Sequence, residues 1–208
     1  MKIINYGHSC FKIIFNDLSI VLDPYQDKSV PGLVLPNNLK ANYVFASHSH
    51  FDHCALEKVE VIKTNEKLDI KEIILPHDKV GGQQRGMNIA RLFKLGDKTI
   101  LHLGDIGDVN ELFKHKELEN IDIVLCPING FFTISSLDAV KAYNVLHWKL
   151  IIPMHYEIKE KGIGYPDGNQ IGIFKNNIKD YIELDNDELE VSEDLFKHKS
   201  LIFLKHRG

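Results

Sequence analysis

The sequence has few cysteines, no long apolar run and no excess of positive charge, and each absence excludes a class of protein. The three cysteines, Cys10, Cys54 and Cys126, form no CxxC pair, so we expect reduced thiols and no disulfide framework. No apolar stretch reaches the length of a membrane span, and the first residues lack the apolar core of a signal peptide. We therefore expect a cytoplasmic protein that has no membrane partner.

The charge balance argues against a nucleic-acid partner. The 208 residues carry a formal net charge of −4, whereas binding to a phosphate backbone needs a basic surface. Residues 180–194 include eight acidic side chains and no basic one, and we interpret this run as a solvated face. With 44% hydrophobic and 26% charged residues, the composition is that of a globular protein, and its length suits one domain over residues 1–208.

No GxSxG motif is present, so a serine nucleophile of that type is not expected. Instead, three histidines and one aspartate lie within six positions: His48, His50, Asp52 and His53. They follow the apolar run 43–46, which is typical of a buried strand. In an extended chain, side chains at alternate positions share one face. The spacing therefore places His48, His50 and Asp52 on the same side.

The composition of this cluster favours a metal site. Four titratable groups packed together would repel one another or lose hydration unless a cation organised them. One tetrahedral ion cannot easily use four ligands that are so close in sequence, because its ligands must approach from separated directions. Two ions that share the four groups are the easier solution.

The rest of the chain is predicted to alternate between strands and helices. Strands are expected at residues 2–5, 10–15, 19–22, 71–75, 87–93, 98–103, 122–125, 150–152 and 200–205. Helices are expected at residues 55–62, 108–116, 135–147 and 169–177, and Ser135 with Asp138 predicts a capping box. Residues 25–40 form a loop, 81–86 a flexible connector, and 129–133 a loop that lines a pocket. Asp23 is interpreted as structural, holding the long loop after Pro24.

The motif His48-Ser-His50-Phe-Asp52-His53 resembles the signature of the metallo-β-lactamase superfamily of metal-dependent hydrolases. The N-terminal motifs Tyr6-Gly7-His8-Ser9-Cys10-Phe11 and Leu22-Asp23-Pro24 resemble those of the branch that contains ascorbate-phosphate lactonase. Three further matches follow in the family's order: His77-Asp78 with Arg85-Gly86-Met87-Asn88, then His102-Leu103-Gly104-Asp105, then Ile152-Pro153-Met154-His155-Tyr156. The resemblance covers about residues 3 to 156. It implies an α/β (α+β) fold, the four-layer αββα sandwich.

The resemblance also assigns roles to single residues. It implies that His48, His50 and His77 hold a first metal ion. It implies that Asp52, His53 and His155 hold a second ion and that Asp105 bridges the two. Imidazole and carboxylate ligands together favour two divalent ions, with Zn²⁺ expected and Mn²⁺ or Fe²⁺ as alternatives. Such a pair supplies hydroxide at neutral pH, and Asp52 would orient this nucleophile.

Two other residues are candidates for contact with the substrate. Gly7 permits close approach of the backbone, so His8 could face the cleft as a catalytic proton donor or a substrate contact; a hydrogen-bonded structural histidine is the alternative. Arg85 lies among glycines, where its guanidinium could bind an anionic substrate group; a plain surface arginine is the alternative.

We therefore expect a hydrolase that acts on a small, anionic ester, lactone or phosphoester. One alternative is a nuclease, since the superfamily includes enzymes that cut RNA and DNA; the acidic balance argues against it. Another is a regulatory protein that binds metal without turnover, but every ligand position is intact. The substrate, the native metal and the oligomeric state stay open at this point.

Overall fold

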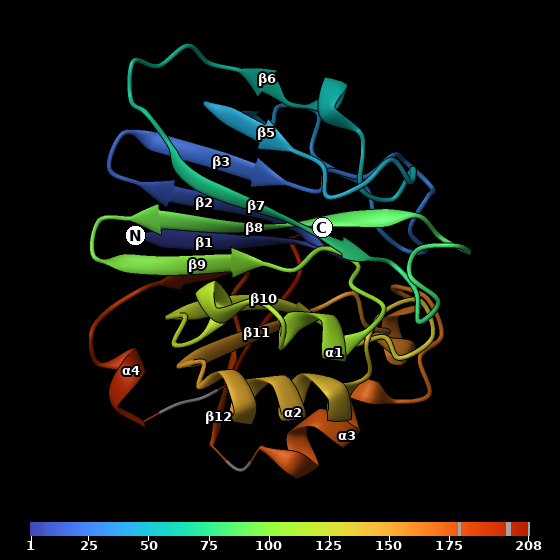
Figure 1. Cartoon of the computed structure of the whole chain (residues 1–208). Helices are drawn as coiled ribbons and strands as arrows, with labels where there is room; N and C mark the ends of the chain where they lie inside the picture. Colours follow the sequence, from blue (N-terminus) through green and yellow to red (C-terminus); the bar gives the residue numbers. More distant parts are fainter. Residues whose placement is uncertain (179, 199–200, 208) are drawn as a thin grey trace.

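The computed structural model describes residues 1–178, 180–198 and 201–207, and two β-sheets form its centre (Figure 1). The five-stranded sheet has the order β13-β1-β2-β3-β5. Strands β1, β2 and β3 form an antiparallel meander, while β5 runs parallel to β3. The strands are β1 (Lys2–Gly7), β2 (Cys10–Phe15), β3 (Leu18–Leu22), β5 (Tyr43–Phe45) and β13 (Glu188–Glu190).

The seven-stranded sheet has the order β12-β14-β11-β10-β9-β8-β7. Strands β7, β8 and β9 are antiparallel, whereas β9, β10, β11, β14 and β12 are parallel. Parallel strands end at a common edge, which gathers the loops that follow them. The strands are β7 (Asp69–Pro76), β8 (Met87–Leu95), β9 (Lys98–His102), β10 (Ile123–Pro127), β11 (Leu150–Met154), β12 (Tyr181–Leu184) and β14 (Leu201–Leu204).

The two sheets pack face to face through alternate side chains of their strands. Ile3 and Ile13 from the five-stranded sheet contribute to the same buried cluster as Phe93, Ile100 and Leu125 from the seven-stranded sheet. On β1, the next residue, Ile4, belongs to a different cluster on the outer face. This period of two is the pattern of a strand buried on both faces.

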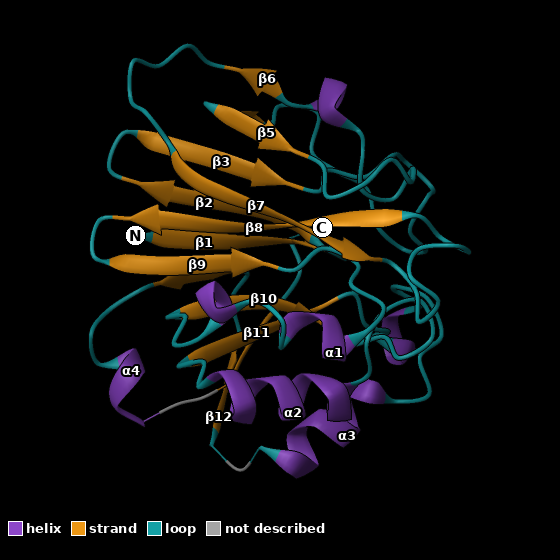
Figure 2. Ribbon diagram, in the orientation of Figure 1, coloured by secondary structure: helices purple, strands orange, loops and turns teal. Residues whose placement is uncertain are grey.

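Helices cover the outer face of the seven-stranded sheet, on the opposite side of the molecule from β6 (Figure 2). Ala139 and Ala142 of the longest helix pack in one cluster with Leu101 and Val124 of the sheet. This helix begins at the predicted capping box, in which Ser135 and Asp138 cap each other's backbone N–H. The helices on this face are α1 (Val109–Leu112), α2 (Ser136–Leu146) and α3 (Gln170–Asn177), whereas Leu195 and Phe196 of α4 (Leu195–His198) pack against the cluster between the sheets.

The outer face of the five-stranded sheet is covered mainly by coil. Residues from the 25–39 loop pack on it, and Tyr25, which is fully buried, donates a hydrogen bond to the Tyr6 carbonyl. A small parallel pair, β4 (Lys40–Ala41) and β6 (Glu60–Val61), completes this layer. The predicted α/β fold of the αββα type is confirmed, with this coil layer on one side.

The helix predicted at residues 55–62 is wrong. Only Leu56–Lys58 forms a single 3₁₀ turn, and no side chain caps its first residue. The backbone N–H groups of Glu60 and Ile62 instead donate to the carbonyls of Leu39 and Ala41. These N–H groups are therefore bonded to the segment at 39–41, and not to carbonyls within a helix.

Other predicted boundaries also change. The acidic run at 180–194 was predicted as a solvated face, and none of its eight acidic side chains is buried. The run also supplies β12 and β13, one edge strand for each sheet. The helix predicted at 108–116 is only α1 followed by a 3₁₀ turn at Lys116–Leu118. The last strand is found at β14, while position 200 lies outside the described residues. Among the helices of the described chain, none has the length and apolar character to cross a bilayer.

Candidate active site

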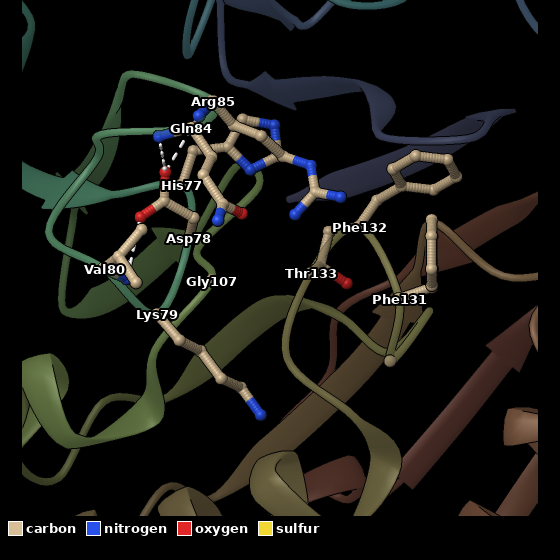
Figure 3. A pocket seen from close by; sticks show the side chains of 11 residues that line it. His77, Asp78, Lys79, Val80, Gln84, Arg85, Gly107, Phe131, Phe132 and Thr133 are labelled. Carbon is tan, nitrogen blue, oxygen red and sulfur yellow. Dashed lines mark hydrogen bonds between the residues drawn. The ribbon is translucent and has the colours of Figure 1, made fainter.

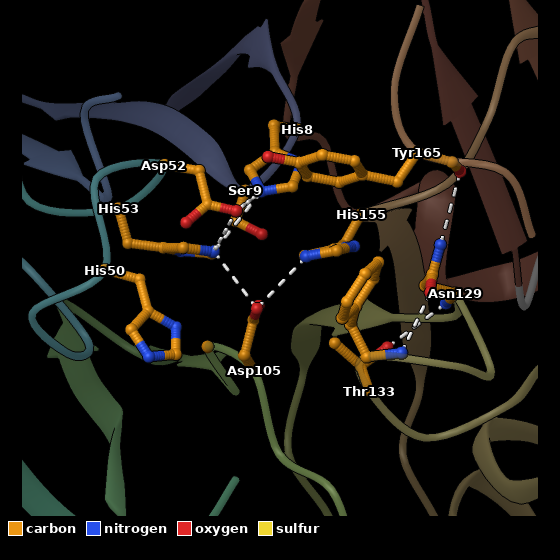
Figure 4. Close-up of polar contacts among 12 residues, drawn as sticks. His8, Ser9, His50, Asp52, His53, Asp105, Asn129, Thr133, His155 and Tyr165 are labelled. Atoms are coloured by element: carbon orange, nitrogen blue, oxygen red, sulfur yellow. Dashed lines mark hydrogen bonds and ion pairs between the residues drawn. The ribbon is translucent and has the colours of Figure 1, made fainter. Parts of the chain in front are cut away.

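The predicted metal ligands come from separate segments that meet at one end of the two sheets. The cluster from His48 to His53 follows β5, and His77 follows β7, while His8, predicted as a proton donor or substrate contact, follows β1. Asp105 comes shortly after β9, and His155 comes directly after β11. Figure 4 shows His53, Asp105 and His155 directed toward one another, with His8 and Asp52 beside them. The fold therefore gathers all seven predicted ligands.

A first group consists of His48, His50 and His77. One ring nitrogen from each lies within 4.8 Å of the others. The Nε2 atom of His48 and the Nδ1 atom of His50 are 3.0 Å apart. These are the three residues that were predicted to hold the first ion.

A second group consists of Asp52, His53 and His155 together with His8. Their ligand atoms also lie within 4.8 Å of one another. Nε2 of His8 is 3.2 Å from Oδ2 of Asp52 and 3.2 Å from Nε2 of His53. The first three are the predicted ligands of the second ion, and the structure adds His8 to them.

Asp105 lies between the two groups. Its Oδ2 atom is 3.1 Å from Nε2 of His53, 3.0 Å from Nε2 of His155 and 3.6 Å from Nε2 of His77. Its other oxygen, Oδ1, is buried and has no hydrogen-bond partner in the described part of the chain. A carboxylate that reaches members of both groups has the position predicted for a bridging ligand.

The electrostatics of the cluster suit metal binding. Burial lowers the pKa of His8 to about 3 and that of His48 to about 3, which keeps both rings neutral. Burial raises the pKa of Asp52, but the hydrogen bond from His8 and the nearby His53 outweigh this effect and lower it. Neutral imidazoles and ionised carboxylates are the forms that bind metal ions. The donor set therefore fits divalent ions.

His53 lies between two carboxylates. Burial lowers the pKa of His53, but Asp105 and Asp23 outweigh burial and raise it well above its usual value. The protein thus favours a positive charge at this position. A proton or a metal ion on Nε2 meets that demand.

Asp23 has a different role from the one predicted. Its carboxylate is buried, and it accepts hydrogen bonds from the backbone N–H and hydroxyl of Ser47, at 2.6 and 2.7 Å. Its Oδ2 also lies 2.7 Å from Nδ1 of His53. Burial raises the pKa of Asp23, but His102 and His53 lower it to about 2. The anion therefore holds the proton on Nδ1 and leaves Nε2 of His53 for the cluster.

Asn88, which the sequence placed in a family motif without a role, is a positioning residue. Its Oδ1 accepts a hydrogen bond from the Asp105 backbone N–H at 2.8 Å, and its Nδ2 donates to the Leu103 carbonyl at 2.7 Å. Gly104, between them, has φ +56°, and a Cβ there would lie 2.1 Å from Oδ1 of Asn88. Only glycine fits this turn, so the Leu103-Gly104-Asp105 motif places the carboxylate.

Strained backbone conformations gather at the site. His8 and His155 both have φ 54°, and Asp23 has φ 45°. Residues other than glycine rarely adopt such values, and where they do the strain is often associated with function. The first two are candidate ligands, and Asp23 contacts a third.

A cavity of about 230 Å³ opens onto the cluster. Five predicted ligands line it, and so do Arg85, Phe132 and Tyr165. The prediction that the 129–133 loop lines a pocket is confirmed by Phe132. His8, with 4% exposure, is not part of this lining, so the structure favours its contact with Asp52 and His53 over contact with a substrate.

The predicted flexible connector at 81–86 is wrong. Asp78 accepts four backbone hydrogen bonds of 2.8–2.9 Å from residues 80–85: Oδ1 accepts from the N–H groups of Val80 and Gly82, and Oδ2 from those of Gln84 and Arg85. The loop is therefore folded around a carboxylate, and its glycines allow the turns.

Tyr165 was not found from the sequence either. Its hydroxyl donates to the Ser29 carbonyl, and its ring lies 5.7 Å from that of His8. It thus joins the 25–39 loop to the wall of the site. It lies beyond the region that resembles the family, and no local pattern marks it.

His102 hydrogen-bonds to the backbone through both ring nitrogens. It is buried, its Nε2 donates to the Ser9 carbonyl, and its Nδ1 accepts from the Gly104 N–H.

Comparison with known proteins identifies the family. The model of the beta-lactamase superfamily domain matches residues 2–155. The chain belongs to this superfamily. A UPF0173 metal-dependent hydrolase of Staphylothermus marinus is 33% identical over 192 residues, which cover 75% of this chain and 84% of the relative. Another, from Natranaerobius thermophilus, is 28% identical over 186 residues, covering 75% and 83%.

A solved structure agrees with the sequence relatives. A protein of Thermotoga maritima, named as a Zn-dependent hydrolase of the metallo-beta-lactamase superfamily, superposes with a TM-score of 0.74 at 26% identity over 99% of each chain. The predicted superfamily is therefore confirmed, and the protein is a metal-dependent hydrolase of the metallo-β-lactamase superfamily.

Proposed function

We propose that this hydrolase uses two divalent metal ions to cleave a small, anionic ester, lactone or phosphoester. The observation that carries the proposal is the geometry of Asp105, whose Oδ2 lies within 3.6 Å of ring nitrogens from both ligand groups. One group consists of His48, His50 and His77, and the other of Asp52, His53 and His155, with His8 beside them. Each group would hold one ion.

The donor types favour Zn²⁺, because imidazole and carboxylate together suit zinc better than magnesium or calcium. When bound, two such ions activate water as a nucleophile at neutral pH and offset the negative charge that develops in the transition state. Hydrolysis by such a pair of ions would need no serine or cysteine nucleophile.

The chain's own residues orient and enclose the reacting groups. Asp52 lines the cavity, and its Oδ2 lies 3.2 Å from Nε2 of His8. An ionised carboxylate fixed in this way can accept a hydrogen bond from the attacking water and orient it. Phe132 and Tyr165 form walls that exclude bulk water, which strengthens the electrostatic contacts inside.

The preference for an anion follows from charge. Two divalent ions carry more positive charge than the two carboxylates Asp52 and Asp105 can neutralise, and Arg85 adds another cation at the cavity wall. A cleft that is lined by charges of one sign and has low-dielectric walls concentrates ligands of the opposite charge. A small volume also favours a small substrate.

A substrate screen tests the proposal. Metal-replete protein is assayed against aryl phosphomonoesters, phosphodiesters, carboxylic esters and γ-lactones, with Asp105→Asn as the impaired variant and His147→Asn as the control at an exposed, distant histidine. We expect turnover of at least one class, with a rate that rises with pH and levels off near or above about pH 7. Activity that survives both Asp105→Asn and chelation would contradict the proposal. Bound metal with no turnover of any class would favour a binding protein.

A further inference from the structure

A second cavity, whose lining side chains are drawn in Figure 3, shares part of its lining with the metal-ligand cavity. Its volume is about 350 Å³. His77, Arg85 and Phe132 line both cavities, whereas Lys79 and Thr133 line only the second. One elongated molecule can therefore reach the candidate metal ligands and the second cavity at the same time.

Arg85 marks the boundary between the cavities, and its guanidinium has no anionic partner among the described residues. Its Cζ lies 5.4 Å from the ring centroid of Phe132 and 5.7 Å from that of Phe131. Its backbone N–H is fixed by Asp78. Within the described ranges, no carboxylate forms an ion pair with this side chain. The guanidinium is thus held by the loop and the aromatic rings while its N–H donors stay available.

The second cavity has an excess of positive charge. Lys79 contributes an exposed ammonium group that pairs with no acidic residue in the part of the chain that the structure describes. Asp78 is the acidic residue of the lining, and its two oxygens are already engaged by four backbone N–H groups. Two cations with free donors therefore face one carboxylate whose hydrogen-bonding capacity is largely used.

We propose that the second cavity binds a second anionic group of the substrate, a phosphate or carboxylate remote from the bond that is cleaved. This inference rests on the proposed function. The reacting ester lies at the metal ligands, Phe132 contacts the connecting part, and Arg85 and Lys79 hold the second anion. The planar fork of Arg85 matches either oxyanion in a bidentate contact, while Lys79 adds a point charge.

Calorimetric titration of the metal-loaded full chain tests this arrangement. The probes are propylphosphonate, which has one anionic group, and alkane-α,ω-bisphosphonates with spacers of increasing length. We expect one spacer length to bind about 10- to 100-fold more tightly than propylphosphonate, the range of a charge-assisted hydrogen bond. Lys79→Gln, which alters only the second cavity, should reduce this preference and leave propylphosphonate binding unchanged. Lys63→Gln, at an exposed lysine that lines neither cavity, is the charge-matched control.

Two results would overturn the inference: no spacer length binds more tightly than propylphosphonate, or the preference persists in the Lys79→Gln, Arg85→Gln double variant. Failure of the proposed function gives a different result. In that case propylphosphonate binding would not depend on Asp105, and Asp105→Asn would bind it as tightly as the unmodified chain.

Discussion

At the scale of single residues, Asp23 controls the orientation of His53. Its carboxylate is 2.7 Å from Nδ1 of His53, so Nε2 faces the other ligands. Carboxylates that support a histidine in this way raise the basicity of the ligand and fix its ring. The neighbouring Ser47 holds the carboxylate in place through two hydrogen bonds.

Substitution of Asp23 by Asn should weaken metal binding. The amide lacks the negative charge that holds the proton on Nδ1, and loss of such a supporting group typically costs about 10- to 100-fold in metal affinity. Competition with a chelating dye measures the change. Asp122→Asn is the matched control, because Asp122 is also a buried carboxylate, accepts hydrogen bonds from Thr99 and Lys149, and contacts no candidate ligand. Equal affinities in the two variants would show that Asp23 only supports the fold.

The candidate ligands could be named from the sequence, but the residues that position them could not. His48, His50, Asp52 and His53 are close in the chain, so their common chemistry is visible as a motif. Asp23 meets His53 across 30 positions, and Asn88 meets Asp105 across 17. Contacts of this kind depend on strand pairing, which local patterns do not specify.

At the scale of structural elements, the loop from Asp78 to Arg85 is folded around one carboxylate. Four backbone N–H groups converge on Asp78, and this places Arg85 at the boundary of the two cavities. The loop is therefore a preorganised part of the site.

Asp78→Asn should loosen this loop, because an amide offers one acceptor oxygen in place of two. We expect faster hydrogen exchange at residues 80–85 and weaker binding of anionic substrates, with a smaller effect on neutral esters. Exchange measured by mass spectrometry checks the first effect. Asp167→Asn is the control, since Asp167 accepts three backbone N–H bonds in another loop. Unchanged exchange at 80–85 would mean that the loop is ordered by its other contacts.

Most strands and the main helix could be predicted from local patterns. The strand predicted at 10–15 coincides with β2, and the capping box predicted the start of α2. The helix predicted at 55–62 was wrong because backbone bonds to Leu39 and Ala41 replaced its own. Strand β12 was hidden in a run of acidic residues, since only its pairing with β14 shows that it belongs to the sheet.

At the scale of the whole molecule, the candidate metal site connects both sheets. Its ligands follow strands of the five-stranded sheet, such as β5, and strands of the seven-stranded sheet, such as β9 and β11. Ions bound there would hold the two halves of the fold together. From the sequence, a site shared by both sheets could be predicted only because the motifs occur along the chain in the order typical of the family.

Chelation should therefore lower the thermal stability. A ligand that binds only the folded state stabilises it by about 4 kcal/mol when its free concentration is 1,000 times its Kd. Scanning calorimetry with and without chelator measures the loss in Tm, and Asp105→Asn should show a smaller loss. An unchanged Tm after confirmed metal removal would indicate that the ligands do not bind ions in the folded protein.

The metal content of the protein tests the two-ion centre most directly. Elemental analysis of metal-replete, desalted protein should give about two transition-metal ions per chain, because we propose that each ligand group binds one. His50→Ala and Asp105→Asn should lower this content, and His147→Asn should leave it unchanged. A content of at most one ion per chain in the unmodified protein, under the same metal-replete conditions, would contradict the two-ion centre.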